Sequence, residues 1–264
     1  YEGYKAMHVC PRCETTLAAS EVAQGYKDVK DISVYAKFEL EGEPGAFLVA
    51  WTTTPWTLPG NVALAVGADI EYVKISVGAE KYILAKNRLE FVQKLLGQVE
   101  IEILEEFSGK DLLGKSYKPI FSDYAVDEKL ENHANGWKVY AADFVTTESG
   151  TGIVHIAPAF GEDDMALGKK EKLPFVQHVG MDGKIKEEVS GFGGMYVKPK
   201  SDDDKERLGT DIAVLKYLQE KGTFFAKENL VHSYPHCWRC DWPLINYAAS
   251  SWFVNVTALK PRLI

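Results

Sequence analysis

Uncharged polar side chains crowd residues 51–61, which read WTTTPWTLPGN. Four threonines and an asparagine offer hydrogen-bond donors and acceptors, while Pro55 and Pro59 restrict the backbone that carries them. An apolar run at 46–50 directly precedes the stretch and is typical of a buried strand, so the hydroxyls come where a strand ends and a loop begins. Such a surface can hold a water molecule or a sugar hydroxyl. The alternative is a β-branched strand end followed by a Pro-Gly turn.

A second stretch, residues 150–164, reads GTGIVHIAPAFGEDD. It predicts a buried strand at 153–157 that contains His155, then a turn into a helix with an acidic start. Carboxylates are favourable at a helix N-terminus, so we accept a capping role for two of the three acids at 162–164. His155 in an apolar strand is more often a packed core residue than a functional one. The Gly-Thr-Gly is not a dinucleotide fingerprint, because the third glycine and the helix it should open are absent.

Four cysteines form two CxxC pairs, Cys10 with Cys13 and Cys237 with Cys240. Four thiolates in this form suit the tetrahedral coordination of zinc. The pairs lie near opposite ends of the chain, far beyond the roughly 15 to 20 residues of a compact zinc ribbon. One structural zinc ion bound by all four would therefore bring the two ends together, as a module inserted into a host domain requires.

Other interpretations of the cysteines remain. Two disulfides are disfavoured in a reducing cytosol, and a redox CxxC lacks the thioredoxin-like setting here. His8 and His236 lie beside the pairs and are candidate substitute ligands, although a lone histidine is more often a solvated or core residue.

Composition limits the classes of function. The 264 residues carry a net charge of -8, which argues against a general electrostatic surface for nucleic acid and leaves room only for a local basic groove. No apolar run approaches the roughly 18 residues of a membrane span, and no signal-peptide pattern opens the chain. We expect a cytoplasmic protein without a membrane partner. The chain begins within an element and ends on Pro-Arg-Leu-Ile, which suggests a segment of something longer.

Hydrophobic periodicity predicts more strands than helices. The first half should hold strands at 33–40, 46–50, 72–77, 81–85, 100–105 and 137–145, and one helix from an Asn87 cap to Gly97 that buries Leu89, Phe91, Val92, Leu95 and Leu96. In the second half, 179–194 should be a loop with short strands and 201–207 a solvated charge run. Thr210 or Asp211 should cap a helix that buries Ile212, Leu215 and Leu218 and ends at Gly222. The fold class is then mixed α/β and mainly β, barrel-like, with peripheral helices.

The two polar stretches, in this order, together with residues 232–240 (HSYPHCWRC), resemble the editing (CP1) domain inserted into class I aminoacyl-tRNA synthetases for branched aliphatic amino acids. Within that family they are similar to the isoleucyl form. Valyl and leucyl relatives typically have Thr-Thr-Arg-Pro where this chain has Thr53-Thr54-Pro55, and another residue at His155. Phe160 departs from the family, because many relatives carry histidine there; it touches no expected role. The nucleotide-binding and lysine-loop signatures of the synthetic site are absent.

The resemblance implies an editing hydrolase for Val-tRNA(Ile), and perhaps for valyl-adenylate, in which water attacks the aminoacyl ester. Asp164 would bind the α-ammonium group, and His155 would narrow the side-chain pocket. The remaining roles are shared: Thr53, Thr54 and Thr57 would hold the aminoacyl group, the terminal ribose and the attacking water; Asn61 would support the loop; and Thr52, Ala157, Trp51 and Trp56 would line the pocket, with core packing equally open for the two tryptophans.

The same resemblance implies partners and a division of the chain. The partners would be the 3′ end of tRNA(Ile) carrying valine and the catalytic domain of a host synthetase, which would also bind ATP, and the chain would be a monomer. A first zinc knuckle would occupy 1–28, the editing domain 29–230, and a second knuckle with a return strand 231–264. Two alternatives stand beside this reading: a zinc-pinned module that only binds tRNA or protein, and a valyl-type editor acting on Thr-tRNA(Val).

Overall fold

Strand β4 (Ala46–Thr52) is the centre of the main sheet in the computed structural model, which describes residues 1–97 and 99–263. One edge of β4 pairs antiparallel with the long strand β3 (Tyr26–Glu39). The other edge pairs in parallel with two strands, first β7 (Glu80–Ala85) and then β10 (Ile153–Ile156). Both faces of β4 are largely buried, which explains why its sequence is continuously apolar and does not alternate.

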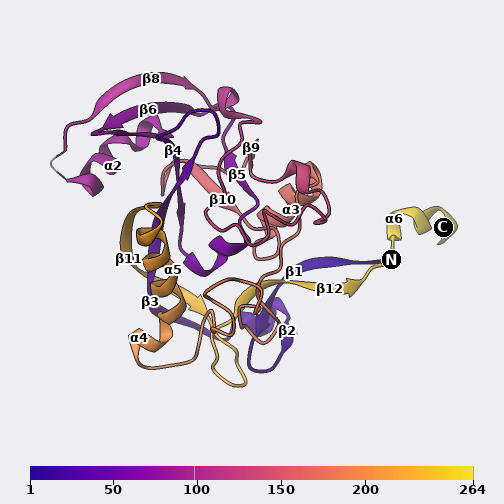
Figure 1. Ribbon diagram of the computed structural model, residues 1–264. Coiled ribbons are helices and arrows are strands. Elements are labelled where there is room, and N and C mark those ends of the chain that lie inside the picture. The colour runs from indigo at the N-terminus through magenta and orange to yellow at the C-terminus, as the bar shows by residue number, and fades with distance from the viewer. Residues whose placement is uncertain (98, 264) are drawn as a thin grey trace.

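The rest of the main sheet extends from this centre. Within the described residues its order is β8-β6-β7-β4-β10-β5-β9, and β3 and β11 branch from β4. The added strands are β5 (Ala63–Val66), β6 (Glu71–Val77), β8 (Glu102–Ser108), β9 (Lys138–Ala141) and β11 (Phe224–Pro235). The sheet curls into a partial barrel, with β6 and β8 at one end and β3 and β11 along one side (Figure 1). The predicted mainly β, barrel-like class is confirmed.

Helices lie at the periphery of the sheet. The α-helices are α1 (Ala19–Val22), α2 (Leu89–Leu96), α3 (Glu162–Glu171), α4 (Asp204–Arg207), α5 (Gly209–Glu220) and α6 (Val256–Leu263), and the 3-10 turns are η1 (Pro55–Gly60), η2 (Lys86–Arg88), η3 (Gly109–Leu112) and η4 (His133–Asn135). Helix α5 packs against β3, β11 and η1, which carries the threonine loop. None of the helices described is long and apolar enough to cross a membrane.

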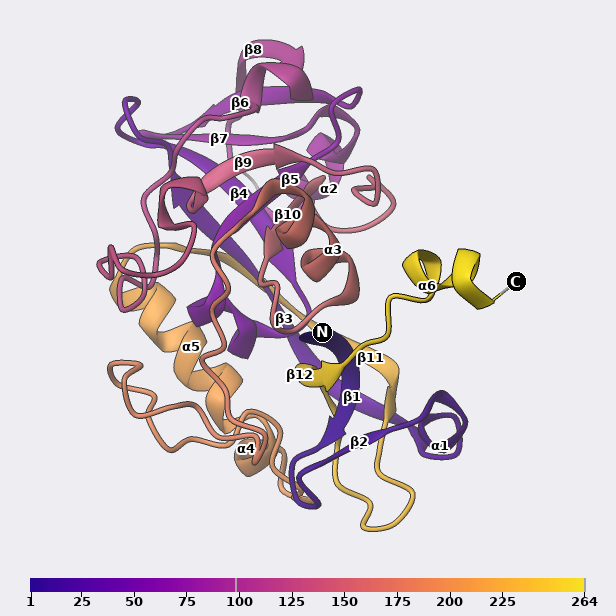
Figure 2. The same ribbon diagram turned by 90° about the vertical axis from the view of Figure 1, so that its right-hand side faces the viewer.

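A smaller sheet joins the two ends of the chain. Strand β1 (Glu2–Cys10) pairs antiparallel with β12 (Ile245–Trp252) along its length and with the short strand β2 (Thr15–Leu17). The ribbon of β1 and β12 leads away from the main sheet toward both termini and α6 (Figures 1 and 2). We call this smaller sheet, with the turns that hold the four cysteines, the neck. The domain boundaries predicted at 28/29 and 230/231 fall inside the continuous strands β3 and β11, which run from the neck into the main sheet. Ile264 lies outside the described residues.

Two helix starts were predicted wrongly. Asn87 lies in η2 and gives its side-chain amide to Thr147 Oγ1 at 2.6 Å, so Arg88 precedes α2 as its N-cap. Helix α5 begins at Gly209, which places Thr210 and Asp211 in its first turn and not at the cap. Both are buried and bonded to other elements, so tertiary partners replace the local capping bond that sequence favours.

Other elements differ in extent. The strand predicted at 137–145 ends at Ala141, and the one at 100–105 is displaced to β8. The charge run at 201–207 forms α4 at its end and is not wholly solvated, because Arg207 reaches buried Asp31 at 3.2 Å. In α5, Leu215 and Leu218 are buried as expected, while the side chain of Ile212 is only partly buried.

Tyr72 ties two turns of the sheet together and supports a test of the fold. Its fully buried hydroxyl accepts from the Gly67 amide at 3.0 Å and donates to the Gly152 carbonyl at 2.7 Å, just before β10. We predict that Tyr72→Phe lowers the free energy of unfolding by about 1–3 kcal/mol, because it leaves a buried amide and carbonyl without a partner. Chemical denaturation should show this loss. The control Tyr26→Phe, at a ring that is half exposed, should change little.

Candidate active site and metal centre

The carboxyl ends of β4 and β10 open into one cavity of about 250 Å³. The strands are adjacent and parallel, with Val154 opposite Trp51, so the segments that follow them leave the sheet at the same edge. One segment is the threonine loop, and the other is the turn that leads into α3. The lining consists of Trp51, Thr52, Thr53, Thr54, Thr57, Val154, His155, Ala157, Phe160 and Asp164.

The threonine hydroxyls form a connected row along one wall. Thr54 Oγ1 lies 3.3 Å from both Thr52 Oγ1 and Thr57 Oγ1, and the Thr54 amide donates to Thr52 Oγ1 at 3.1 Å. Thr57 Oγ1 donates to the Thr54 carbonyl at 2.8 Å, which closes the first turn of η1. These bonds fix the positions of Thr52, Thr54 and Thr57, while Thr53 lines the cavity without a bond of this row.

His155 ends the row at a buried position. Its Nε2 lies 2.9 Å from Thr57 Oγ1, whose single hydrogen is directed to the Thr54 carbonyl. We therefore assign the imidazole proton to Nε2, which donates to the hydroxyl oxygen. Nδ1 is buried without a partner among the described residues. Burial lowers the pKa of His155 to about 4, with a smaller contribution from His178, so the ring is neutral at pH 7.

Asp164 faces the cavity from the first turn of α3. Its Oδ1 accepts from the Ala157 amide at 2.8 Å, which links the helix start to the end of β10. Burial raises the pKa of Asp164 to about 6, and Asp163 adds to the rise. Glu162 and Asp163 are exposed in the first turn of α3, where negative charge suits the helix N-terminus. Gly161 makes room for this carboxylate, because a Cβ there would collide with Asp164 Oδ2.

Aromatic rings close the remaining sides. Trp51 and Phe160 line the cavity, whereas Trp56 is buried behind Phe160 with the ring centroids 5.4 Å apart. Asn61 also lies outside the lining: it donates to the Ala63 carbonyl at 2.9 Å and accepts from the Tyr117 hydroxyl at 2.7 Å. These contacts agree with a supporting place for Asn61 in the loop and place Trp56 in the core.

Eight of the ten predicted pocket residues meet in the cavity, and Trp56 and Asn61 lie behind it. Sequence reasoning missed Val154 and gave Phe160 no role, although Phe160 contributes to the wall. Val154 had a usable signal, since it precedes His155 on a strand predicted to lead to the site. Phe160 had none beyond its place in the turn, because only the packing against Trp56 and His178 orients its ring.

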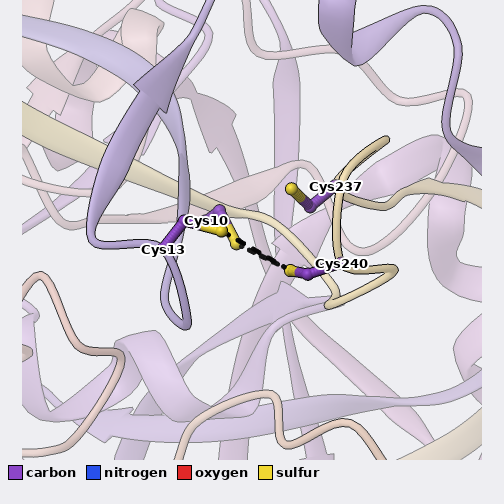
Figure 3. Close-up of side chains that lie close together, drawn as sticks. All are labelled: Cys10, Cys13, Cys237 and Cys240. Carbon is purple, nitrogen blue, oxygen red and sulfur yellow. Dashed lines mark hydrogen bonds between the residues drawn. The ribbon is translucent and has the colours of Figure 1, made fainter.

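The four cysteines meet at the base of the neck (Figure 3). Their Sγ atoms all lie within 4.8 Å of one another, with Cys10 to Cys240 at 3.4 Å and Cys13 to Cys240 at 3.7 Å. Tetrahedral zinc–thiolate bonds of about 2.3 Å place sulfur atoms about 3.8 Å apart, so the cluster has the dimensions of a metal site. Cys10 and Cys237 are buried, Cys240 is partly exposed and Cys13 is exposed.

Neither neighbouring histidine belongs to this cluster as described. His236 directs Nδ1 to the Tyr234 carbonyl at 3.0 Å, and its backbone amide donates to Gly25. His8 lies on β1 opposite Asn246. The predicted alternative of histidine ligands is therefore not favoured by the arrangement.

Comparison with known proteins relates this architecture to a family. Over all 264 residues the chain is 45% identical to an isoleucine–tRNA ligase of Clostridium acetobutylicum and 44% identical to one of Bacillus thuringiensis, and it covers 24% of the length of each. No protein-family model matches the chain. Among solved structures, the editing domain of the P. knowlesi cytosolic leucyl-tRNA synthetase has a TM-score of 0.49 at 11% identity, covering 78% of this chain and 99% of that one.

The similarity along the whole chain relates it to the aminoacyl-tRNA synthetases. More narrowly, the whole chain is homologous to a segment of isoleucine–tRNA ligases, and it spans 24% of the length of the curated relatives that it matches. This confirms the family predicted from the motifs at 51–61, 150–158 and 232–240.

Removing one cysteine should show whether the cluster holds the ends together. We predict that the purified chain binds close to one metal ion and that Cys237→Ser loses it, because a tetrahedral site needs all four thiolates. Elemental analysis measures the metal, and thermal unfolding should show a lower midpoint for the variant and for the chelated chain. A metal-free chain with full stability would contradict the prediction.

Asp164 should make stability depend on pH with a definite sign. Its pKa of about 6 lies above the ordinary 3.8, so the folded state favours the protonated carboxyl, and this stability is lost as the pH rises through about 6. We predict that Asp164→Asn has a free energy of unfolding about 1–2 kcal/mol higher than that of the original chain at pH 7.5, which thermal unfolding should show as a higher midpoint. Near pH 4 the two chains should be equally stable.

The neighbouring acid provides the control for that comparison. Asp163→Asn, on the same helical turn but exposed, should not show the pH-dependent gain. Equal behaviour of the two variants would mean that the first-turn charge acts only on the helix and that burial of Asp164 has no effect.

Proposed function

We propose that the chain is the editing domain of an isoleucine–tRNA ligase and hydrolyses the aminoacyl ester of mischarged Val-tRNA(Ile), with valyl-adenylate as a second substrate. The observation that carries this proposal is the cavity itself, a small space with one carboxylate facing a row of hydroxyls. An aminoacyl ester offers the complementary groups: an ammonium, a small side chain, an ester carbonyl and a ribose hydroxyl.

Asp164 supplies the charge for binding. A carboxylate with a pKa of about 6 is ionised at neutral pH and pairs with the α-ammonium group through a charge-assisted hydrogen bond. The Ala157 amide holds Oδ1 in place, and the bare Cα of Gly161 gives Oδ2 its space. This contact recognises what all aminoacyl esters share, so it contributes affinity without choosing the side chain.

The threonine row positions the reacting groups. Thr53, Thr54 and Thr57 orient the aminoacyl group, the terminal ribose and a water molecule for attack on the ester carbonyl, and orientation of this kind can supply much of a rate enhancement. Thr57 and His155 do not form an activated nucleophile. The hydroxyl hydrogen points to the Thr54 carbonyl, the imidazole Nε2 carries its own proton, and a pKa of about 4 makes the ring a weak base.

His155 sets the size of the side-chain pocket. A synthetic site for isoleucine rejects valine poorly, because one missing methylene changes binding by only about 1–3 kcal/mol, a limit for which isoleucine–tRNA ligases are themselves the standard example. Editing must then reject isoleucine. The buried imidazole, fixed by Thr57, occupies the space that the additional methylene would need, a steric penalty against the correctly charged product.

The cysteine cluster fits zinc bound by Cys10, Cys13, Cys237 and Cys240. When bound, the ion supplies a structural cross-link between the two ends of the chain and takes no part in hydrolysis, because the cluster lines none of the reaction cavity. The partners that follow are the 3′ end of tRNA(Ile) and the catalytic domain of the host synthetase. We also propose a cytoplasmic location and a division of the chain into domains at residues 28/29 and 230/231.

Deacylation by the chain and its His155→Ala variant tests the proposal. We expect the original chain to hydrolyse Val-tRNA(Ile) faster than Ile-tRNA(Ile). His155→Ala should raise the isoleucine rate by about tenfold or more while the valine rate changes little, because the obstruction is removed. Single-turnover measurements with both esters decide this.

Other outcomes separate the alternatives. A parallel loss of both rates would indicate that His155 acts as a general base. Unchanged rates would indicate that it only packs in the core. Preferential hydrolysis of Thr-tRNA(Val) would identify a valyl-type editor. The absence of hydrolysis for every ester would leave a module that only binds.

A further inference from the structure

Two buried side chains outside the cavity hold the backbone of the threonine loop. Asp211 on α5 accepts from the Trp56 amide at 3.2 Å, and His178 lies 2.9 Å from the Trp56 carbonyl through Nε2. Both side chains are almost completely buried, and neither lines the cavity. The peptide groups on both sides of Trp56 are therefore held by residues distant in sequence.

The bond from the Trp56 amide to Asp211 takes the place of an N-cap bond, which the side chain of Thr54 does not provide. The first amides of a helical turn have no partner within the turn, and Thr54, the N-cap of η1, gives none from its side chain. Asp211 supplies the acceptor from another helix. A carboxylate there also suits the positive end of the turn.

The Asp211 carboxylate is in turn held by buried charges. Lys198 Nζ lies 3.6 Å from Asp211 Oδ2 and 2.9 Å from Asp31 Oδ1, and Arg207 adds a second cation to Asp31 at 3.2 Å. His232 lies 3.0 Å from the other Asp31 oxygen. Two cations thus balance two carboxylates. Burial raises the pKa of Asp211 to about 6, and the charge of Lys198 acts in the opposite direction.

Packing also holds the bond between His178 and the Trp56 carbonyl in one geometry. A carbonyl only accepts, so His178 Nε2 must carry the proton, and its Nδ1 is buried without a partner among the described residues. The ring is packed edge-on against Phe160, with centroids 4.8 Å apart, and against Gly60, where a Cβ would lie 2.6 Å from Nδ1. The ring therefore has no room to turn away from Trp56.

We propose that Asp211 and His178 are positioning residues that fix the Trp56 backbone and, through it, the hydroxyls of Thr54 and Thr57. Trp56 lies between these two threonines, and the Thr57 amide and hydroxyl both bond to the Thr54 carbonyl, so displacement of the Trp56 peptides moves both hydroxyls. This role rests on the proposed hydrolysis. Asp211 and His178 touch no substrate, so they should affect the rate of hydrolysis and not the affinity for the ester.

Paired variants at each position test the role. Asp211→Ala and His178→Leu remove the bonds, whereas Asp211→Asn and His178→Gln retain an acceptor or donor near the same point. We expect the first pair to lower kcat for Val-tRNA(Ile) hydrolysis by about tenfold or more with KM nearly unchanged, since small displacements of reacting groups strongly reduce rate. The second pair should remain within about threefold of the original chain.

A buried control separates positioning from stability. Leu215→Ala, one turn along α5 from Asp211 and without a bond to the Trp56 backbone, should lower the melting temperature without this loss of kcat. Backbone amide exchange adds a readout independent of activity: ¹⁵N-tryptophan labelling marks only six residues, and the Trp56 amide should exchange faster in Asp211→Ala but not in Leu215→Ala. The His178 pair, outside the ion network, decides the question if Asp211→Ala does not fold.

The outcomes distinguish this role from the proposed function. The role is overturned if the original chain is active and the first pair loses no more kcat than Leu215→Ala, if the loss falls on KM, or if asparagine and glutamine rescue nothing. An original chain that hydrolyses no aminoacyl ester removes the proposed function and this role together, while the Trp56 exchange rates still report whether the contacts exist.

Discussion

The parallel pairing of β4 with β10 is the constraint on which the candidate site depends. Because the strands run in the same direction and lie side by side, with Val154 opposite Trp51, the segments that follow them must leave the sheet together. One carries neutral hydroxyls and the other carries a carboxylate, so neither stretch alone contains the site. The antiparallel strand β3 fixes the other edge of β4 over six residue pairs, and this prevents a shift of register that would turn the threonines to another face.

Burial gives the site its electrostatic character. The same removal from water raises the pKa of Asp164 and lowers that of His155, both toward the uncharged form. At neutral pH one carboxylate therefore faces neutral hydroxyls and a neutral ring. No strong base lies near the threonines among the described residues. The ionised Asp164 carboxylate costs stability because it is buried. The ammonium group of the proposed substrate would offset this cost, a common compromise between stability and function.

The neck closes the chain on itself, and it is connected to the cavity through continuous strands and helix α5. The ribbon of β1 and β12 and the four cysteines close the chain on itself, and β3 and β11 carry that closure into the main sheet as continuous strands. Helix α5 then links the same region to the threonine loop through Asp211. Buried ion pairs contribute little net stability in many proteins, so the network of Lys198, Asp31 and Asp211 is weak evidence for stability, and its link to the site is the bond from Asp211 to the Trp56 amide.

The sequence by itself determined the family, the mainly β class, the two stretches that meet in the cavity and the four cysteines, because each rests on local spacing or residue type. Through resemblance alone it also singled out Asp164 among the acids at 162–164, and this residue lines the cavity. Only the tertiary structure showed that Phe160 is a wall and Trp56 is not, that Asn61 lies behind the loop, and that Asp211 bonds to Trp56 and does not cap α5. The physical reason is that local pattern specifies which groups need a partner, whereas the packing of distant elements decides which partner they find.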